Sequence, residues 1–177
     1  MDLPVGELTP PPAIENKRLV LRPLDLDDAR DLMQQLGDWE VARWLAPVPH
    51  PSTDEDAGRF IVTLSDAVGC WAVVEKQAFR GAVEVMDGEL GFWIGRSSWG
   101  RGLATEAACA ACGAWFVAGG GALRSSCMEG NRASRRVLLK LGFEDTGPRT
   151  IRSASLGRDV PGRMMRLARA PLCKVSA

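Results

Sequence analysis

The sequence contains a single histidine, His50, and five cysteines with irregular spacing. Zinc sites need several thiolate or imidazole ligands at short spacing, and Cys109 and Cys112 form a lone Cys-x-x-Cys pair. With no second pair and no histidine nearby, we interpret these two as small buried side chains of an alanine-rich helix. No metal site is therefore expected, and the odd number of scattered cysteines favours reduced thiols in the cytoplasm.

Neither sign of charge is in excess, since Lys and Arg number 22 and Asp and Glu also number 22. Binding a phosphate backbone requires a basic excess, so no direct nucleic-acid binding is expected. No apolar run is long enough to cross a bilayer. Residues 1–12 are acidic and proline-rich, rather than basic and then apolar as in a signal peptide. These absences predict a cytoplasmic protein without a membrane partner.

Apolar periodicity characteristic of a folded domain runs from about residue 16 to residue 170. Residues 1–15, which include three consecutive prolines, are expected to form a flexible arm, and residues 171–177 a short tail. No internal repeat or interdomain linker interrupts the central segment. Its length fits one domain with a sizeable core.

The pattern within this segment predicts an α/β (α+β) fold. Its order is strand, two helices, three antiparallel strands, helix, strand, helix and two strands. This order favours one mixed, mostly antiparallel sheet with helices on both faces. The expected strands are residues 18–24, 71–75, 79–86, 89–94, 123–128, 149–155 and 163–168, and the expected helices begin near Asp25, Ser52, Leu103 and Asn131.

The most informative segment is a glycine-rich turn between a strand and a helix, residues 99–106, Trp-Gly-Arg-Gly-Leu-Ala-Thr-Glu. A helix N-terminus has unpaired amides and a partial positive charge, and it attracts anions. Gly100 and Gly102 lack Cβ atoms, so the backbone can approach a ligand closely, and Arg101 adds a full positive charge. The segment is neither a P-loop nor a Gly-x-Gly-x-x-Gly fingerprint. It predicts a phosphate-binding turn, with a ligand-free connection as the alternative.

Three segments together resemble the GNAT superfamily of N-acetyltransferases, in the RimJ/RimL-like branch that includes the ribosomal-protein N-terminal acetyltransferases. Residues 99–104 are similar to its acetyl-CoA motif, Gln/Arg-x-x-Gly-x-Gly/Ala, with Trp99 departing from the first position. Residues 131–143 resemble its Asn-x-x-Ser…Lys-x-Gly-Phe segment, and residues 46–57 its proline-rich loop and second helix. The resemblance covers about residues 16–169.

The resemblance implies a single GNAT-like domain whose sheet splays open between its fourth and fifth strands, here residues 89–94 and 123–128. Acetyl-CoA is the implied co-substrate, with its pantetheine arm in the gap and its pyrophosphate on the glycine-rich turn. A free amine then attacks the thioester directly, without a covalent enzyme intermediate. The implied cofactor-binding residues are Trp93, Ile94, Trp99, Gly100, Arg101, Gly102, Leu103, Ala104, Thr105 and Asn131, of which Asn131 also caps a helix.

The chemistry needs an oxyanion donor, for which a backbone N–H near Ile94 is suitable, and a base for the amine. Glu84 and Glu89 are the candidate bases, with a solvated structural carboxylate as the favoured alternative for each. Many GNAT members protonate the leaving thiolate with a tyrosine, but this chain has none. Ser134 is the matching alternative, and its hydroxyl either donates a proton or completes a local cap. Glu106 is interpreted as structural, because its charge would repel a pyrophosphate.

The identity of the acceptor stays open. In this family the proline-rich loop borders the acceptor site. Trp39 and Trp44 either line a pocket there or anchor the loop, whereas His50 is interpreted as a surface residue. We expect transfer to a primary amine, either a protein N-terminal α-amine or a small molecule, and a homodimer is compatible with the sequence. The alternative is a non-catalytic acyl-CoA-binding or sensing module with the same fold.

Overall fold

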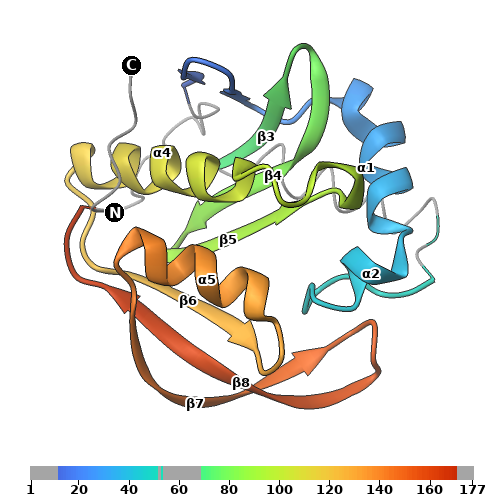
Figure 1. Cartoon of the computed structure of the whole chain (residues 1–177), viewed down its shortest axis with the longest axis vertical. Coiled ribbons are helices and arrows are strands. Elements are labelled where there is room, and N and C mark those ends of the chain that lie inside the picture. Colours follow the sequence, from blue (N-terminus) through green and yellow to red (C-terminus); the bar gives the residue numbers. More distant parts are fainter. Residues whose placement is uncertain (1–11, 52, 54–68, 171–177) are drawn as a thin grey trace, which may run out of the picture.

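The computed structural model describes residues 12–51, 53 and 69–170, which form an eight-stranded sheet with helices on both faces (Figure 1). The strands are β1 (Ile14–Glu15), β2 (Val20–Arg22), β3 (Cys70–Glu75), β4 (Ala78–Met86), β5 (Glu89–Ile94), β6 (Leu123–Met128), β7 (Glu144–Ser153) and β8 (Arg158–Leu167). The helices are α1 (Ala29–Leu36), α2 (Trp39–Ala42), α4 (Leu103–Val117) and α5 (Arg132–Leu141), with 3-10 turns η1 (Leu26–Asp28) and η2 (Arg96–Ser98).

The sheet order is β1-β2-β3-β4-β5-β6-β8-β7. Every neighbouring pair is antiparallel except β5 and β6, which are parallel. The predicted mixed, mostly antiparallel sheet is therefore confirmed. The helix predicted to begin near Ser52 lies outside the described residues.

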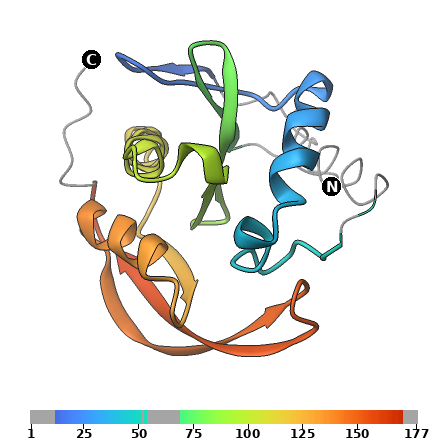
Figure 2. The same ribbon diagram turned by 45° about the vertical axis from the view of Figure 1, so that its right-hand side comes forward.

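Two hydrophobic cores lie on opposite faces of the sheet. Alternation along β4 directs Val83 and Val85 to the core under α4 and α5, and Ala82 to the core under α1 and α2. Figure 2 shows these two pairs of helices on either side of the central strands. The sheet therefore separates two helical layers, α4 with α5 on one face and α1 with α2 on the other.

Helix α4 is buried along most of its length, which explains its small side chains. The residues from Ala107 to Cys112 are all buried. Cys112 is a free thiol, as are Cys70 and Cys127, whereas Cys109 is disulfide-bonded. The expectation of reduced thiols is therefore wrong for Cys109, and the Cys-x-x-Cys pair is not itself a disulfide. Among the described residues, no cluster of His, Cys, Asp and Glu is arranged to hold a metal ion.

Residues just before the expected domain start at residue 16 contact the sheet. Ile14 and Glu15 pair with β2, and the indole Nε1 of Trp71 donates to the carbonyl of Pro12 at 3.0 Å.

The last hairpin also differs from the sequence prediction, because its turn lies at residues 154–157. Pro161 suggested a loop but lies within β8. The pairing of β8 with β6 ends at Gly162 opposite Met128, so Pro161 has no partner in β6 that needs its missing N–H.

The parallel strands β5 and β6 separate soon after they meet. The only Cα pair between them in the described chain is Glu89 with Arg124. Two further bonds close this end, from the Arg124 N–H to the Gly88 carbonyl and from the Ser125 hydroxyl to the Leu90 carbonyl, both at 2.8 Å. Beyond Leu90 the strands are unpaired, which confirms the predicted splay.

Candidate active site

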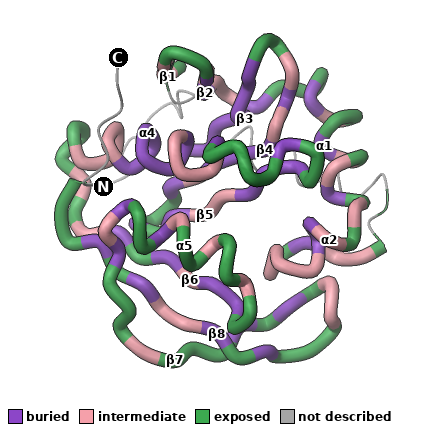
Figure 3. The backbone as a smooth tube through the Cα atoms, viewed as in Figure 1, coloured by how far each residue is buried: buried purple, intermediate pink, exposed green. Residues whose placement is uncertain are grey.

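The carboxyl ends of β5 and β6 lie at the same edge of the sheet, because the two strands are parallel. The glycine-rich turn follows β5 and the start of α5 follows β6, so both flank the open end of the gap (Figure 1). The turn between β5 and α4 is mostly exposed, in contrast to the buried strands behind it (Figure 3).

The two glycines of the turn both have left-handed backbone conformations, with φ of +75° at Gly100 and +79° at Gly102. Side chains disfavour this region, which explains glycine at both positions. The indole Nε1 of Trp99 donates to the Ile94 carbonyl at 2.6 Å and closes the turn on the end of β5. Trp99 itself is 46% exposed.

The N-terminus of α4 has no side-chain cap, because its N-cap residue is Gly102. The first intrahelical bond runs from the Glu106 N–H to the Gly102 carbonyl at 3.1 Å. Within the described structure, no hydrogen bond uses the backbone N–H groups of Leu103, Ala104 and Thr105. These amides are therefore available to an anion, as the sequence predicts.

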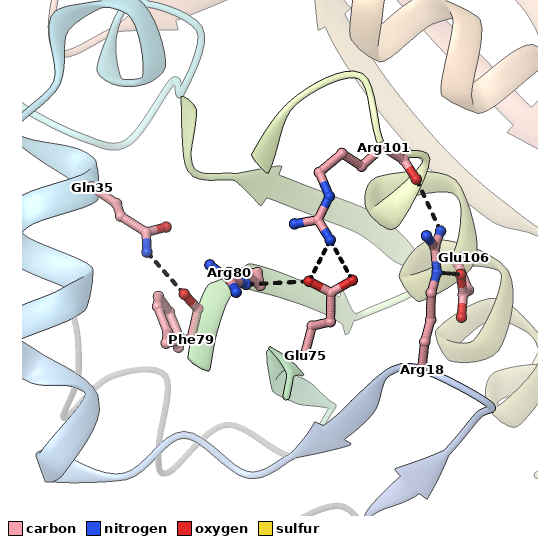
Figure 4. A network of polar contacts seen from close by, with 7 residues as sticks. All are labelled: Arg18, Gln35, Glu75, Phe79, Arg80, Arg101 and Glu106. Carbon is pink, nitrogen blue, oxygen red and sulfur yellow. Dashed lines mark hydrogen bonds and ion pairs between the residues drawn. The ribbon is translucent and has the colours of Figure 1, made fainter. Parts of the chain in front are cut away.

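The side chain of Arg101, which is 42% exposed, is paired with a buried carboxylate under the turn. Its Nη2 donates to both carboxylate oxygens of Glu75 at 2.7 Å, and Glu75 is only 4% exposed (Figure 4). These hydrogen bonds, opposed in part by burial, lower the pKa of Glu75. The charge expected to attract phosphate is thus paired beneath the turn, and the backbone amides are the groups left to face a ligand.

Arg18 makes a second connection under the turn. Its Nη2 donates to the Arg101 carbonyl at 2.9 Å and its Nε to Glu106 Oε2 at 2.7 Å (Figure 4). Glu106 is therefore paired with a cation in the first turn of α4, which supports its structural interpretation.

The edge of β5 that faces the gap is formed by alternate residues. The Gly95 N–H donates to the Arg80 carbonyl at 2.8 Å, and Trp93 lies opposite Ala82, so these two β5 residues bond toward β4. The backbones of Phe92 and Ile94 therefore face the gap, whereas the backbone of Trp93 faces β4.

The opposite side of the gap ends at the start of α5. The Asn131 side chain accepts from the Ser134 N–H at 3.1 Å, so the predicted cap is present. Because the cap uses the backbone of Ser134, its hydroxyl is not part of it, and this hydroxyl makes no hydrogen bond to another described residue. That leaves the hydroxyl free for the proton-donating role considered from sequence.

Glu84 lies on the central strand β4, on the face that packs against α1 and α2. It is half-buried, and burial, with a smaller contribution from the charge of Glu89, raises its pKa. Gly91 is its cross-strand partner, and a Cβ there would lie 2.6 Å from Glu84 Oε1. The absence of a side chain at Gly91 therefore makes room for the carboxylate.

Glu89 occupies a different environment, at the closed end of the gap. Its Oε1 accepts from the Ser126 hydroxyl at 3.1 Å and lies 3.4 Å from Arg149 Nη1. This exposed carboxylate ties β5 to β6 and β7, so its position fits a structural role better than that of a base.

A groove of about 450 Å³ lies between α2 and the end of the β6–β8 region. The guanidinium of Arg43 lies 4.7 Å from the ring centroid of Trp44, and the Trp39 ring lies 5.1 Å from that of His50. His50 is half-buried, with Nδ1 lacking a partner in the described structure, so its expected surface position is wrong. The lining residues are Trp39, Arg43, Trp44, Met128, Glu129, Leu156, Arg158, Val160 and Pro161.

Residues 18–144 match the family model described as an acetyltransferase (GNAT) domain, so the chain belongs to this family. It is an acyl-CoA-dependent acetyltransferase whose co-substrate is acetyl-CoA. No curated protein matches the sequence. Among the described residues, no helix has the length and apolar character needed to span a membrane.

Solved structures show the same fold at low sequence identity. A GNAT acetyltransferase from Bacillus anthracis has a TM-score of 0.79 at 17% identity, covering 89% of this chain and 98% of that one. The microcin C7 self-immunity acetyltransferase MccE, in complex with acetyl-CoA and AMP, has a TM-score of 0.76 at 19% identity over 92% and 98%. The ribosomal L7/L12 α-N-protein acetyltransferase RimL, in complex with coenzyme A, has a TM-score of 0.75 at 16% identity over 90% and 99%.

Proposed function

We propose that this protein transfers the acetyl group of acetyl-CoA to a primary amine, by direct attack in a ternary complex. The observation that carries the proposal is the gap between β5 and β6, which opens beside uncommitted amides of residues 103–105. The acceptor class includes protein N-terminal α-amines, as in the RimJ/RimL-like branch, and small-molecule amines.

The proposed cofactor site uses two sets of backbone donors. The turn and the first residues of α4 (Trp99, Gly100, Arg101, Gly102, Leu103, Ala104 and Thr105) hold the pyrophosphate. The pantetheine arm adds to the exposed edge of β5 as an extra strand would, through the backbone groups of Phe92, and ends beside Ile94, whose N–H is left for the thioester carbonyl. Because Trp99 occupies the Ile94 carbonyl, that group is not offered to the pantetheine. Asn131 contributes its side-chain amide from the other side.

The proposed proton acceptor is Glu84. The amine nitrogen bonds to the thioester carbonyl carbon, the C–S bond breaks, and the amine proton passes to Glu84 through water. A raised pKa suits this role, because a base works best when its pKa is near the working pH. The Ile94 N–H stabilises the oxyanion. The departing sulfur takes a proton from the Ser134 hydroxyl, which regains one from water, or from water that this hydroxyl orients.

The acceptor amine reaches the gap along the groove beside α2. The two indoles provide an apolar wall, and Glu129 provides a carboxylate that favours an ammonium group. The volume suits either a small ligand or the first residues of a peptide. A cytoplasmic location is also part of this proposal. Among the described cysteines, Cys70, Cys112 and Cys127 are free thiols and favour it, whereas the disulfide-bonded Cys109 does not.

Release of free coenzyme A, measured with a panel of amines, tests the proposal. The panel comprises peptides with free N-termini, N-terminally blocked peptides with one lysine, and small primary amines. We expect release above the hydrolysis background with at least one group. Binding of acetyl-CoA without release for any amine would instead indicate a sensing module, and would overturn the catalytic assignment of Glu84 and Ser134.

A further inference from the structure

The buried carboxylate of Glu75 belongs to neither the expected site nor the acceptor groove. It ends β3, is 4% exposed and accepts two hydrogen bonds from Arg101, while Arg80 Nε lies 3.5 Å from its Oε2. A buried charge is costly unless it is paired, so this carboxylate holds Arg101 firmly. The side chain that it holds belongs to the middle residue of the turn.

Arg101 is restrained at its backbone as well as at its side chain. Its carbonyl accepts from Arg18, which also pairs with Glu106 on α4. In a trans peptide the carbonyl and the following N–H point in opposite directions. Holding the Arg101 carbonyl against Arg18 therefore directs the Gly102 N–H to the opposite side, away from the ion pairs beneath the turn.

The cluster beneath the turn also has a favourable charge. Three guanidinium groups (Arg18, Arg80 and Arg101) face two carboxylates (Glu75 and Glu106), which leaves one positive charge in excess (Figure 4). Both carboxylates are engaged by arginines, so neither opposes an anion above the turn.

We propose that Glu75 is a positioning residue for acetyl-CoA, which preforms the pyrophosphate-binding turn by anchoring Arg101 from below. The inference rests on the proposed cofactor site. Glu75 touches neither the cofactor nor the reacting atoms. Its effect is to fix the backbone amides in their binding orientation before the ligand arrives, which reduces the ordering cost of binding.

The test is Glu75→Gln, which keeps the shape of the side chain but removes its charge. Without its anchor, Arg101 and the amides of the turn sample several orientations. We expect the Kd for acetyl-CoA, measured by calorimetry, to rise about tenfold. The kcat at saturating acetyl-CoA should stay within about twofold, because the anchor acts on binding alone.

Asp28→Asn is the matched control for a loss of stability. Asp28 is also 4% exposed and is held by Arg22 through two bonds of 2.7 Å, but it lies at the start of α1. Both substitutions should lower the melting temperature. Only Glu75→Gln should raise the Kd for acetyl-CoA, and an equal rise in both would show a general structural effect and overturn the proposal.

Arg101→Met gives a second test that does not require Glu75→Gln to fold, because an unchanged Kd for acetyl-CoA in this variant would overturn the proposal. Comparison of the two variants separates anchoring from direct charge attraction. If Glu75 acts by anchoring, both variants weaken binding, and the double variant is no weaker than Arg101→Met alone. If Arg101 instead contacts phosphate, its release in Glu75→Gln tightens binding, which would overturn the proposal. If the wild-type protein does not bind acetyl-CoA, the proposed function is wrong. If wild type and Glu75→Gln bind acetyl-CoA equally, only the role of Glu75 is wrong.

Discussion

Among single residues, Glu84 combines a central position with an environment that disfavours its charge. It lies on β4, half-buried, with a pKa raised mainly by burial. Glu89 is exposed and already bonded to Ser126 and Arg149. Of the two carboxylates singled out from the sequence, the surroundings of Glu84 are the ones expected of a base.

We expect Glu84→Gln to lower kcat/KM by at least about 100-fold, because glutamine accepts no proton. The same change should raise the melting temperature at neutral pH. The pKa of this carboxyl group is higher in the folded state than its ordinary value of 4.5, so its ionisation costs more in the folded state. The fold therefore loses stability as pH rises from 4.5 to the folded-state pKa, and it does not regain that stability at higher pH. Glutamine carries no such penalty.

The pH profile and a comparison variant check this assignment. Wild-type activity should fall at acidic pH as Glu84 becomes protonated, and this limb should be absent from the residual activity of Glu84→Gln. Glu89→Gln should retain most of the activity and the acidic limb. The reverse pattern would assign the base to Glu89.

Gly91→Ala should reduce activity with little loss of stability. The new Cβ would lie 2.6 Å from Glu84 Oε1, and a flexible carboxylate can rotate away from it. Displacing the base by about 1 Å is expected to lower kcat roughly tenfold or more. Thermal melting and kcat, measured on the same preparation, distinguish this from unfolding. A fall in both would show that the sheet itself is distorted.

The hydroxyl of Ser134 can be removed without removing the helix cap, because the cap uses its N–H. We expect Ser134→Ala to lower kcat about tenfold at an unchanged melting temperature, since coenzyme A thiolate is already a fair leaving group. Asn131→Ala removes the cap itself and should cost about 1 kcal/mol of stability. An unaltered kcat in Ser134→Ala would assign proton donation to water alone.

The sequence indicates which residues form the candidate site, but it does not indicate which contacts their side chains make. The glycines, Asn131 and Ser134 were recognisable because their roles depend on neighbours in sequence. The partnership of Arg101 with Glu75 joins positions on separate elements, and nothing near Glu75 in the sequence marks it as buried. Phe92 and Trp93 were not separable either, because which of them faces the gap depends on the register with β4.

At the scale of elements, the start of α4 is built to leave its amides free. We expect Gly102→Glu to abolish measurable binding of acetyl-CoA, because a negative charge would be added at the N-cap of α4, and its Cβ would lie 3.6 Å from Arg18 Nη2, which holds the Arg101 carbonyl. The left-handed φ of +79° adds a stability cost of about 1 kcal/mol. Retained micromolar affinity in calorimetry would place the pyrophosphate elsewhere.

Gly100→Ala is the control for backbone strain. Its φ is +75°, but an added Cβ there has no atom within 4 Å. It should share the stability cost of Gly102→Glu and weaken binding only partly. Equal loss of binding in both variants would show that strain in the turn, rather than intrusion into the site, is responsible.

The helices and strands themselves were predictable where periodicity was strong and turns were sharp. The strands on either side of the gap, β5 and β6, and the helices α4 and α5 agree with the predicted segments. The predicted strand bounds of the last hairpin were wrong. Pro161 and the nearby glycines are typical of a loop, but pairing with β7 extends β8 through these residues. Helix α2 is a single turn and is too short to show an amphipathic repeat. Its formation therefore depends on tertiary contacts, which the sequence pattern does not reveal.

At the scale of the whole molecule, the gap between β5 and β6 has two walls, and the proposed cofactor site uses both. One wall comprises β5 and the start of α4, and the other comprises β6 and the start of α5. Between β5 and β6, the pairing of Glu89 with Arg124 and the hydrogen bond from the Ser125 hydroxyl to the Leu90 carbonyl lie at the closed end. A ligand that bonds to both walls should therefore stabilise the molecule as a unit.

We expect acetyl-CoA at about 100 times its Kd to stabilise the fold by roughly 2.7 kcal/mol, which raises the melting temperature by about 5–11 °C. Amide hydrogen exchange should slow on both walls together, at Phe92, Ile94 and residues 103–105 on one and near Asn131 on the other. Glu84→Gln, which lacks only the base, should show the same protection, whereas Gly102→Glu should show none. Protection confined to the α4 wall would mean that the pyrophosphate binds while the pantetheine does not enter the gap, and the proposed route of the thioester to Glu84 would then be wrong.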